Sequence, residues 1–192
     1  IGHAAGLVLA QHANDYQLHI ANKFKRVPYD AANQLSDFSS WGLSADGDLK
    51  PDVTLPGGMI YSSVNNGEYY MDRGTSMASP HAAGATVLVK QALKERFPHL
   101  SPEQLQVLVK QMTMSTAIPH VDEETHAYSS VRQQGAGVMD VTAAALGDLY
   151  VTAKDAKSSL TLGNVTDTFE FDVTIHNLSN QDKSVRYETT LQ

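Results

Sequence analysis

The chain has 192 residues, of which 42% are hydrophobic and 18% are charged, and its formal net charge is -7. This composition supports a folded core rather than a disordered tail, and the excess of acidic residues argues against a nucleic-acid-binding protein. The sequence has neither cysteine nor an apolar run of roughly 18 residues, which excludes disulfide bonds, thiol catalysis and a membrane span within the chain.

The first 70 residues predict short elements separated by turns. The apolar run Leu7 to Ala10 predicts a short buried strand. Residues 38–58 are rich in Gly, Pro, Asp and Ser, which predicts a loop with a short strand at Val53–Leu55. The sequence MIYSSV (59–64) predicts a further strand, and the Asn66-Gly67 pair after it is typical of a tight hairpin turn.

Two helices are predicted in the middle of the chain. The first spans Ser76–Arg96 and is stopped by Pro98, because the residue before a proline is disfavoured in the helical conformation. The second opens with SPEQ (101–104), in which the serine is the N-cap, the proline takes the first helical position and the glutamine completes a capping box. Apolar residues recur along this helix at the spacing of one buried face, at Leu105, Leu108, Val109 and Met112.

The pattern changes in the last quarter of the chain. Residues 113–134 predict a loop, and Gly135-Ala136-Gly137 predicts a turn that leads into a short helix, Val141–Leu146. After it, TFEFDVTIHNLS (168–179) alternates apolar and polar residues, which is typical of a half-buried strand in an antiparallel sheet. Neighbouring strands are predicted in LYVTA (149–153) and SVRYETTL (184–191).

A domain boundary is expected near Asp148. The unit after it has three predicted strands, too few to close a sandwich, and is interpreted as the start of a truncated β domain. The chain begins with Ile1 and ends within a strand-like segment. We therefore expect it to be a piece of a longer protein.

The segment with the clearest chemical signature is GTSMASPHAAG (74–84). Gly74 permits a tight turn, and Ser76 is placed at the N-terminus of the predicted helix, where the first amides are unpaired. The Ser76 amide is a natural oxyanion donor there, supported by the positive end of the helix dipole. The alternative is that Ser76 is only the N-cap of a core helix, and the spacing alone does not decide between the two. The segment is not a G-x-S-x-G elbow, since position 78 is Ala.

This motif resembles the serine motif of the subtilisin-like serine peptidases. The similarity continues upstream through FSSWG and KPDVTLPG and downstream through RQQGAG. Together with LYVTAKD and FDVTIHN, the pattern is similar to the streptococcal cell-envelope proteinases of the complement-anaphylatoxin peptidase type. The resemblance covers roughly residues 35–192.

The resemblance implies a fold and a domain organisation. It implies an α/β class, with residues 1–148 as the C-terminal part of a subtilisin-like parallel-sheet sandwich. Residues 149–192 are then the start of an all-β fibronectin type III-like domain. Residues 1–34 match the family poorly and are interpreted as the tail of a protease-associated insertion.

The resemblance also implies roles for four residues of the motif. Ser76 matches the catalytic nucleophile. Thr75, Met77 and Gly74 are assigned to the oxyanion and substrate-binding region, with Thr75 supporting the oxyanion and Met77 lining the leaving-group side. No cofactor and no metal is expected.

The sequence departs from the family pattern at two positions. Arg73 stands where an uncharged residue, often Asn, is common, so that subsites near the serine are expected to be altered. Leu55 replaces the usual Ala of an A-P-G turn, which is interpreted as a variation in packing.

The partners of the nucleophile are not found in the sequence. It contains no H-G-T, D-[ST]-G or A-x-G-N segment, which in the family carry the triad His, the triad Asp and the oxyanion Asn. His81 lies five residues after Ser76, about 140° around a helix axis, and is interpreted as structural. Asp52 is interpreted as a turn or network residue. The acidic run Asp122-Glu123-Glu124 is interpreted as a solvated loop in preference to a calcium site.

The functional prediction is a serine endopeptidase acting on protein or peptide substrates. The rest of the polypeptide is expected to supply the triad Asp and His, so that the 192-residue chain alone is expected to be inactive. The enzyme is expected to be extracellular and anchored to the cell wall of a Gram-positive bacterium. The alternative is a non-catalytic surface adhesin or interaction module that retains a peptidase scaffold.

Overall fold

The computed structural model describes residues 7–8, 10–12, 32–161, 165–166 and 168–188. The chain divides into two compact units, residues 1–32 and 33–192. In the first unit, residues 7, 8, 10 and 11 are helical and exposed, so the strand predicted there is wrong for the residues described. A run of four apolar residues has no period that separates a strand from a helix.

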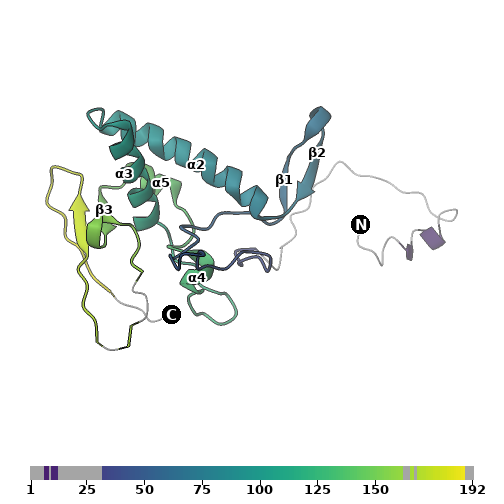
Figure 1. Ribbon diagram of the computed structural model, residues 1–192. Coiled ribbons are helices and arrows are strands. Elements are labelled where there is room, and N and C mark those ends of the chain that lie inside the picture. Colours follow the sequence, from purple (N-terminus) through teal and green to yellow (C-terminus); the bar gives the residue numbers. More distant parts are fainter. Residues whose placement is uncertain (1–6, 9, 13–31, 162–164, 167, 189–192) are drawn as a thin grey trace. The chain divides into compact units, whose positions relative to one another are not determined.

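Two long helices organise the second unit (Figure 1). Helix α2 spans Thr75–Arg96 and helix α3 spans Pro102–Ser115, so both predicted helices are confirmed. The capping box is confirmed as well, because the Ser101 hydroxyl accepts from the Gln104 amide at 3.2 Å and the Gln104 side chain accepts from the Ser101 amide at 2.9 Å. No helix in the described part of the chain is long and apolar enough to cross a membrane.

The core lies where α2 and α3 pack against the short helix α5, Val141–Leu146. The four positions predicted on the inner face of α3 are all buried, which confirms the helical period. On α2, by contrast, only three residues are buried, and the first of them, Ala85, lies at the middle of the helix. The buried core consists of Ala85, Val89, Leu93, Leu105, Leu108, Val109, Met112, Met139 and Ala144.

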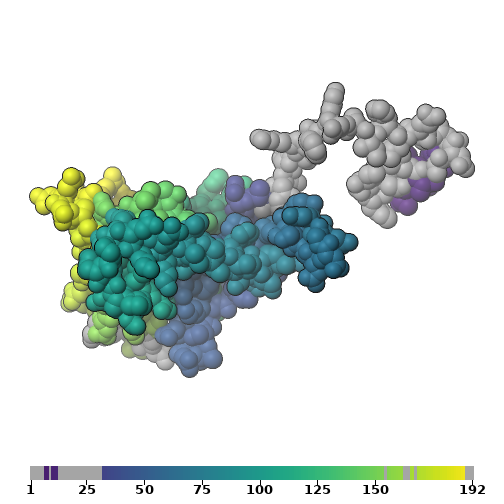
Figure 2. Space-filling model, turned by 90° about the horizontal axis from the view of Figure 1, so that it is seen from above, coloured from purple at the N-terminus to yellow at the C-terminus, as the bar shows by residue number. Residues whose placement is uncertain are grey.

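A β-hairpin precedes α2. Strands β1 (Ile60–Ser63) and β2 (Tyr69–Asp72) pair antiparallel and are joined through the 3-10 turn η1, Asn65–Gly67. Asn66 and Gly67 have φ values of 62° and 73°, in the left-handed region that Asn and Gly tolerate best. The predicted hairpin is therefore confirmed. The hairpin lies at the surface beside the N-terminal turns of α2 (Figures 1 and 2).

The segments predicted as loops are more structured than expected. Helix α3 continues to Ser115, and the short helix α4 spans Val131–Gln134 within the predicted loop. The strand predicted at Val53–Leu55 is reduced to one parallel bridge between Thr54 and Val138. These differences arise because single bridges and one-turn helices depend on contacts distant in sequence rather than on local periodicity.

The C-terminal segment forms less sheet than predicted. Strand β3 (Leu149–Thr152) pairs antiparallel with β4 (Thr174–Asn177), and 3-10 turn η2 (Lys154–Ala156) follows β3. The alternating residues before β4 are not buried, since Phe169 is 48% and Phe171 is 54% exposed. Residues 184–188 form no strand, which corrects that prediction, and residues 189–191 lie outside the described residues.

The sheets of the described residues are both two-stranded and antiparallel. The parallel sheet of the expected sandwich is represented there only by the Thr54–Val138 bridge. The boundary expected near Asp148 and the fibronectin type III-like domain after it stay predictions.

Candidate active site

Ser76 is the second residue of α2, and both Thr75 and Ser76 are exposed while Met77 is half-buried. The N-cap residue is Gly74, so the alternative in which Ser76 is the N-cap is wrong. The amides of Met77 and Ala78 bond back to the Gly74 carbonyl at 3.0 and 3.4 Å. The amide of Ser76 has no acceptor among the described residues, which leaves it available as an oxyanion donor at the positive end of the helix.

The segment Leu55–Gly58, which has neither helix nor strand and bends at Gly58, packs against the start of α2 and is called the 55–58 turn below. The Gly74 amide donates to the Gly57 carbonyl at 2.8 Å. A Cβ on Gly57 would lie 2.7 Å from the Gly74 oxygen and 3.1 Å from the Ala78 Cβ, so only glycine fits this approach. Leu55 packs against the core, as expected for a variation in packing.

The first turns of α2 have few supports of their own. The N-cap Gly74 has no side chain with which to cap the helix, and its φ of 152° is one that other residues rarely adopt. Pro80 lies inside the helix, so the carbonyl of Ser76 lacks the amide that would normally bond to it four residues later.

His81 contacts the same turn. Its Nδ1 lies 2.8 Å from the Pro56 carbonyl oxygen, and because a carbonyl only accepts, Nδ1 carries the proton. The interpretation of His81 as a structural residue is confirmed by this contact. The sequence motif PHAAG contained His81, but nothing local indicated that Pro56, 25 residues earlier, is its partner.

Residues 27–137 match the subtilase family. The chain belongs to the subtilase family. It is 44% identical over 169 residues to a C5a peptidase of Streptococcus pyogenes serotype M6, a match that covers 88% of this chain and 14% of that protein. It is 43% identical over 169 residues to a C5a peptidase of Streptococcus pyogenes serotype M1, with the same coverage. A PII-type proteinase of Lactococcus lactis subsp. cremoris is 41% identical over 120 residues, which are 58% of this chain and 6% of the proteinase.

The chain therefore spans 14% or less of the length of these relatives. The family implies an α/β fold, to which the helices and small sheets of the described residues contribute. A subtilase triad also requires a histidine and an aspartate near the nucleophile.

The side chains just before Ser76 form their own polar group. Asp72 accepts from the Arg73 amide at 2.8 Å through Oδ1 and from the Tyr70 hydroxyl at 3.1 Å through Oδ2. The bond to Asp72 keeps the phenol protonated and raises the pKa of Tyr70 above its ordinary value. Arg73 is exposed and places a cation three residues before Ser76.

Asp52 is engaged in ion pairs with two lysines, Lys50 and Lys110. Burial raises the pKa of its carboxyl, but the hydrogen bond from Lys50 and the charge of Lys110 outweigh burial and hold the pKa below its ordinary value. The two lysine Nζ atoms lie 2.8 and 3.3 Å from the carboxylate oxygens. Asp52 is thus a network residue, as interpreted from the sequence.

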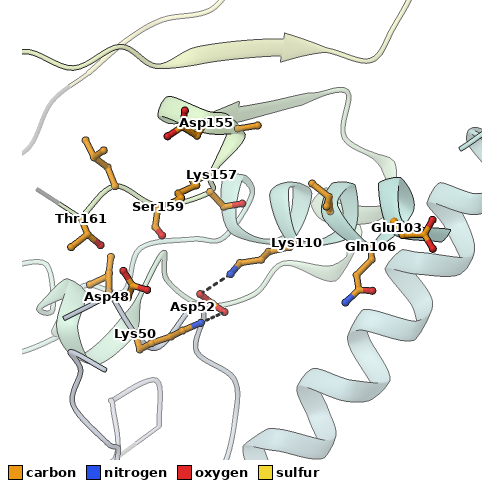
Figure 3. A pocket seen from close by; sticks show the side chains of 15 residues that line it. Asp48, Lys50, Asp52, Glu103, Gln106, Lys110, Asp155, Lys157, Ser159 and Thr161 are labelled. Atoms are coloured by element: carbon orange, nitrogen blue, oxygen red, sulfur yellow. Dashed lines mark hydrogen bonds and ion pairs between the residues drawn. The ribbon is translucent and has the colours of Figure 1, made fainter. Parts of the chain in front are cut away.

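This ion pair lines a pocket of about 1020 Å³ (Figure 3). The pocket lies between residues 48–52, the outer face of α3 and residues 155–161, and none of its lining residues belongs to the segment around Ser76. Figure 3 shows Lys50 and Lys110 reaching Asp52 from opposite sides. The mixture of acidic and basic side chains favours no single ligand charge.

His120 is also occupied by structural bonds. Its Nδ1 lies 2.7 Å from the Ser129 hydroxyl and its Nε2 lies 2.6 Å from the Asn33 carbonyl oxygen. In the neighbouring loop, Asp122 accepts the amides of Glu124 and Thr125, and the bond from Thr125 lowers the pKa of its carboxyl. Within the described residues no group of three or more ligating side chains has the geometry of a metal site.

Gln134 is a polar side chain that is only 1% exposed, and the sequence did not indicate its burial. Its side chain accepts from the His120 amide at 2.6 Å and donates to the Ser129 carbonyl at 2.5 Å. It lies within RQQGAG, but polarity alone predicts an exposed residue there. These bonds connect α4 to both ends of the loop segment 120–129, which lies between α3 and α4.

Proposed function

We propose that this chain carries the nucleophile of a serine endopeptidase and that the full-length protein hydrolyses peptide bonds by acyl transfer through Ser76. Membership of the subtilase family supports serine peptidase activity. The observation that carries the assignment is the place of Ser76, exposed at the second position of α2 with an unbonded amide.

The chemistry follows from this position. The Ser76 Oγ attacks the scissile carbonyl carbon while a base takes its proton, and the same base later gives a proton to the leaving amine. The Ser76 amide donates to the oxyanion of the tetrahedral intermediate, with Thr75 and Gly74 shaping the surrounding turn. Met77 lines the leaving-group side.

The base and its orienting carboxylate are assigned to the rest of the polypeptide. His81 and His120 are hydrogen-bonded to backbone carbonyls, and Asp52 is paired with two lysines. Among the described residues, none of these three side chains hydrogen-bonds to Ser76. We propose that the triad His and Asp, together with the oxyanion Asn, come from segments beyond this chain, and that the chain alone is inactive.

The wider organisation is part of the same proposal. Residues 1–148 are assigned to the C-terminal part of the peptidase domain and residues 149–192 to the start of a fibronectin type III-like domain. The relatives come from Streptococcus and Lactococcus, which supports an extracellular enzyme on a Gram-positive cell wall. The substrate class is protein or peptide, as the name C5a peptidase states for the streptococcal relatives.

The test is active-site labelling of the full-length protein with a serine-reactive phosphonate. Wild-type protein is expected to be labelled and to hydrolyse a peptide substrate, whereas Ser76→Ala is expected to lose both. Ser79→Ala, an exposed serine on the same helix, is the matched control and is expected to be labelled like the wild type.

Two outcomes contradict the proposal. Labelling that survives Ser76→Ala removes the nucleophile assignment. A folded wild-type protein that neither reacts with the probe nor cleaves peptides supports the non-catalytic adhesin instead.

A further inference from the structure

Two parts of α2 are fixed to one external element, the 55–58 turn. The N-cap amide of Gly74 bonds to the Gly57 carbonyl at 2.8 Å, and His81 in the second helical turn bonds to the Pro56 carbonyl at 2.8 Å. The two acceptors are consecutive carbonyls of the same chain segment. Ser76 lies between the two donors in the sequence, so the two bonds to this turn flank the nucleophile along the chain.

We propose that His81 is a positioning residue for Ser76, which acts by bonding α2 to the Pro56 carbonyl and thereby fixing the first turn of the helix. This inference rests on the proposed function, in which Ser76 is the nucleophile. His81 itself touches neither substrate nor the reacting atoms. Its effect passes through the 55–58 turn to the backbone that carries Ser76.

The need for such a residue follows from the weakness of this helix end. A glycine N-cap supplies no side-chain bond, and Pro80 removes the helical partner of the Ser76 carbonyl. Helix ends fray when their terminal groups lack partners. A displacement of about 1 Å at a nucleophile lowers the rate by about 100-fold, so rigid placement of the first turn has a large effect on catalysis.

The contact geometry also explains why histidine suits the position. The Pro56 oxygen takes the Nδ1 proton, and the imidazole reaches across from the helix to the turn, a contact that alanine cannot make. Asparagine carries an amide nitrogen at the same number of bonds from Cβ as Nδ1, whereas glutamine carries it one bond further out. Asparagine can therefore remake the bond to the Pro56 carbonyl, whereas glutamine is polar but places its nitrogen too far out. Comparing the two variants tests whether the bond itself matters or only a polar side chain at this position.

The experiment compares His81→Ala, His81→Asn and His81→Gln in the full-length protein. Turnover is measured per phosphonate-labelled site, so that a loss of folded enzyme does not register as a loss of rate. Gln91→Ala is the matched control, because it removes an exposed side-chain bond to Glu95 on the same helix, away from the 55–58 turn. Its kcat is expected to equal that of the wild type.

His81→Ala is expected to lower kcat per labelled site by about 10-fold or more with KM changed by less than about twofold, as for a group that acts on the transition state only. His81→Asn is expected to restore most of kcat, and His81→Gln is not. An unchanged kcat in His81→Ala overturns the proposal, and so does equal loss in the Asn and Gln variants.

A second measurement keeps this inference separate from the nucleophile assignment. Amide hydrogen exchange in residues 75–79 is expected to be roughly 2- to 10-fold faster in His81→Ala, the range for one lost hydrogen bond, and to return to the wild-type rate in His81→Asn. This readout holds even if labelling does not depend on Ser76. Exchange that is the same in wild type and His81→Ala overturns the positioning role by itself.

Discussion

Arg96 and Asp148 join the C-terminal end of α2 to the segment that leads into β3. The Arg96 Nη2 lies 2.9 Å from the Asp148 Oδ1, and the Nη1 of the same guanidinium donates to the Ala145 and Gly147 carbonyls at 2.8 and 3.0 Å. Both side chains are partly shielded, with exposed fractions of 26% and 31%. One arginine thus satisfies carbonyls at the end of α5 and pairs with a carboxylate beyond it.

Replacing this arginine by lysine is predicted to destabilise the fold. A lysine ammonium is a point charge and cannot reproduce the planar fork that reaches two carbonyls and a carboxylate at once. We expect Arg96→Lys to lose about 1 kcal/mol for each carbonyl bond that is not remade. Urea unfolding measures the loss, and Lys94→Arg, on the exposed side of the same helix end, is the control that is expected to leave stability unchanged. Equal stability of Arg96→Lys and wild type contradicts the prediction.

A methyl group at Gly57 is predicted to displace the start of α2. The added Cβ would lie 2.7 Å from the Gly74 oxygen, a backbone atom that cannot rotate away. We expect Gly57→Ala to lose about 1–3 kcal/mol of stability, typical of overpacking, and to lower kcat of the full-length enzyme. Gly58→Ala is the control, because its Cβ would meet only the Ser36 hydroxyl, at 3.2 Å. Equal stability and equal kcat in the two variants would show that the close approach of Gly57 to α2 does not limit the fold, and would contradict the prediction.

Oxidation of Met77 is predicted to inactivate the full-length enzyme. The Met77 sulfur lies 3.8 Å from the place where a side chain on Gly74 would begin, so a sulfoxide adds a bulky polar group beside the turn that carries Ser76. Met77→Leu is expected to keep most of its activity after peroxide treatment. Met59→Leu and Met71→Leu are the controls, since these methionines are 49% and 47% exposed and neither is next to Ser76 in the sequence. Protection by either control variant argues against the prediction.

The pairing of Asp52 with lysines predicts a pH-dependent contribution to stability. The folded-state pKa of this carboxyl is lowered, so its contribution is present above the ordinary value of 3.8 and is lost as the pH falls below 3.8 through the lower folded value. The size is less than about 1 kcal/mol, because the carboxyl is 33% exposed and solvent screens the pair.

Unfolding of Asp52→Asn and wild type at pH 7 and pH 3 measures this contribution. The wild type is expected to be the more stable at pH 7, and the difference is expected to shrink at pH 3. Asp48→Asn, in the same pocket but outside the two lysine bonds, is the control. A difference that grows as the pH falls has the wrong sign and refutes the assignment.

Removal of the Gln134 side chain is predicted to be among the most damaging changes. It leaves the His120 amide and the Ser129 carbonyl without these partners in a partly buried setting, which we expect to lower the free energy of unfolding by about 2–4 kcal/mol in Gln134→Ala. Thermal unfolding checks this. Gln133→Ala, which makes none of these bonds, is expected to remain close to wild type.

Several elements of this chain follow from the sequence because their signals are local. The SPEQ capping box fixes the start of α3, Asn66-Gly67 fixes the turn between β1 and β2, and Pro98 ends α2, each through neighbours within four residues. The place of Ser76 at the head of a helix was predicted in the same way. The family assignment came from the motif around it.

Other features were decided only by the tertiary structure, because they join residues far apart in the chain. The bond between His81 and Pro56 spans 25 residues and that between His120 and Asn33 spans 87, and neither leaves a periodic pattern that a sequence reading can detect. The alternation of Phe169 to Ile175 predicted a half-buried strand, of which the structure forms only the end, in β4. The apolar residues of this stretch are about half exposed, since the described residues provide no layer to cover them. Local propensity sets the element, whereas burial and side-chain partners depend on which distant segment packs against it.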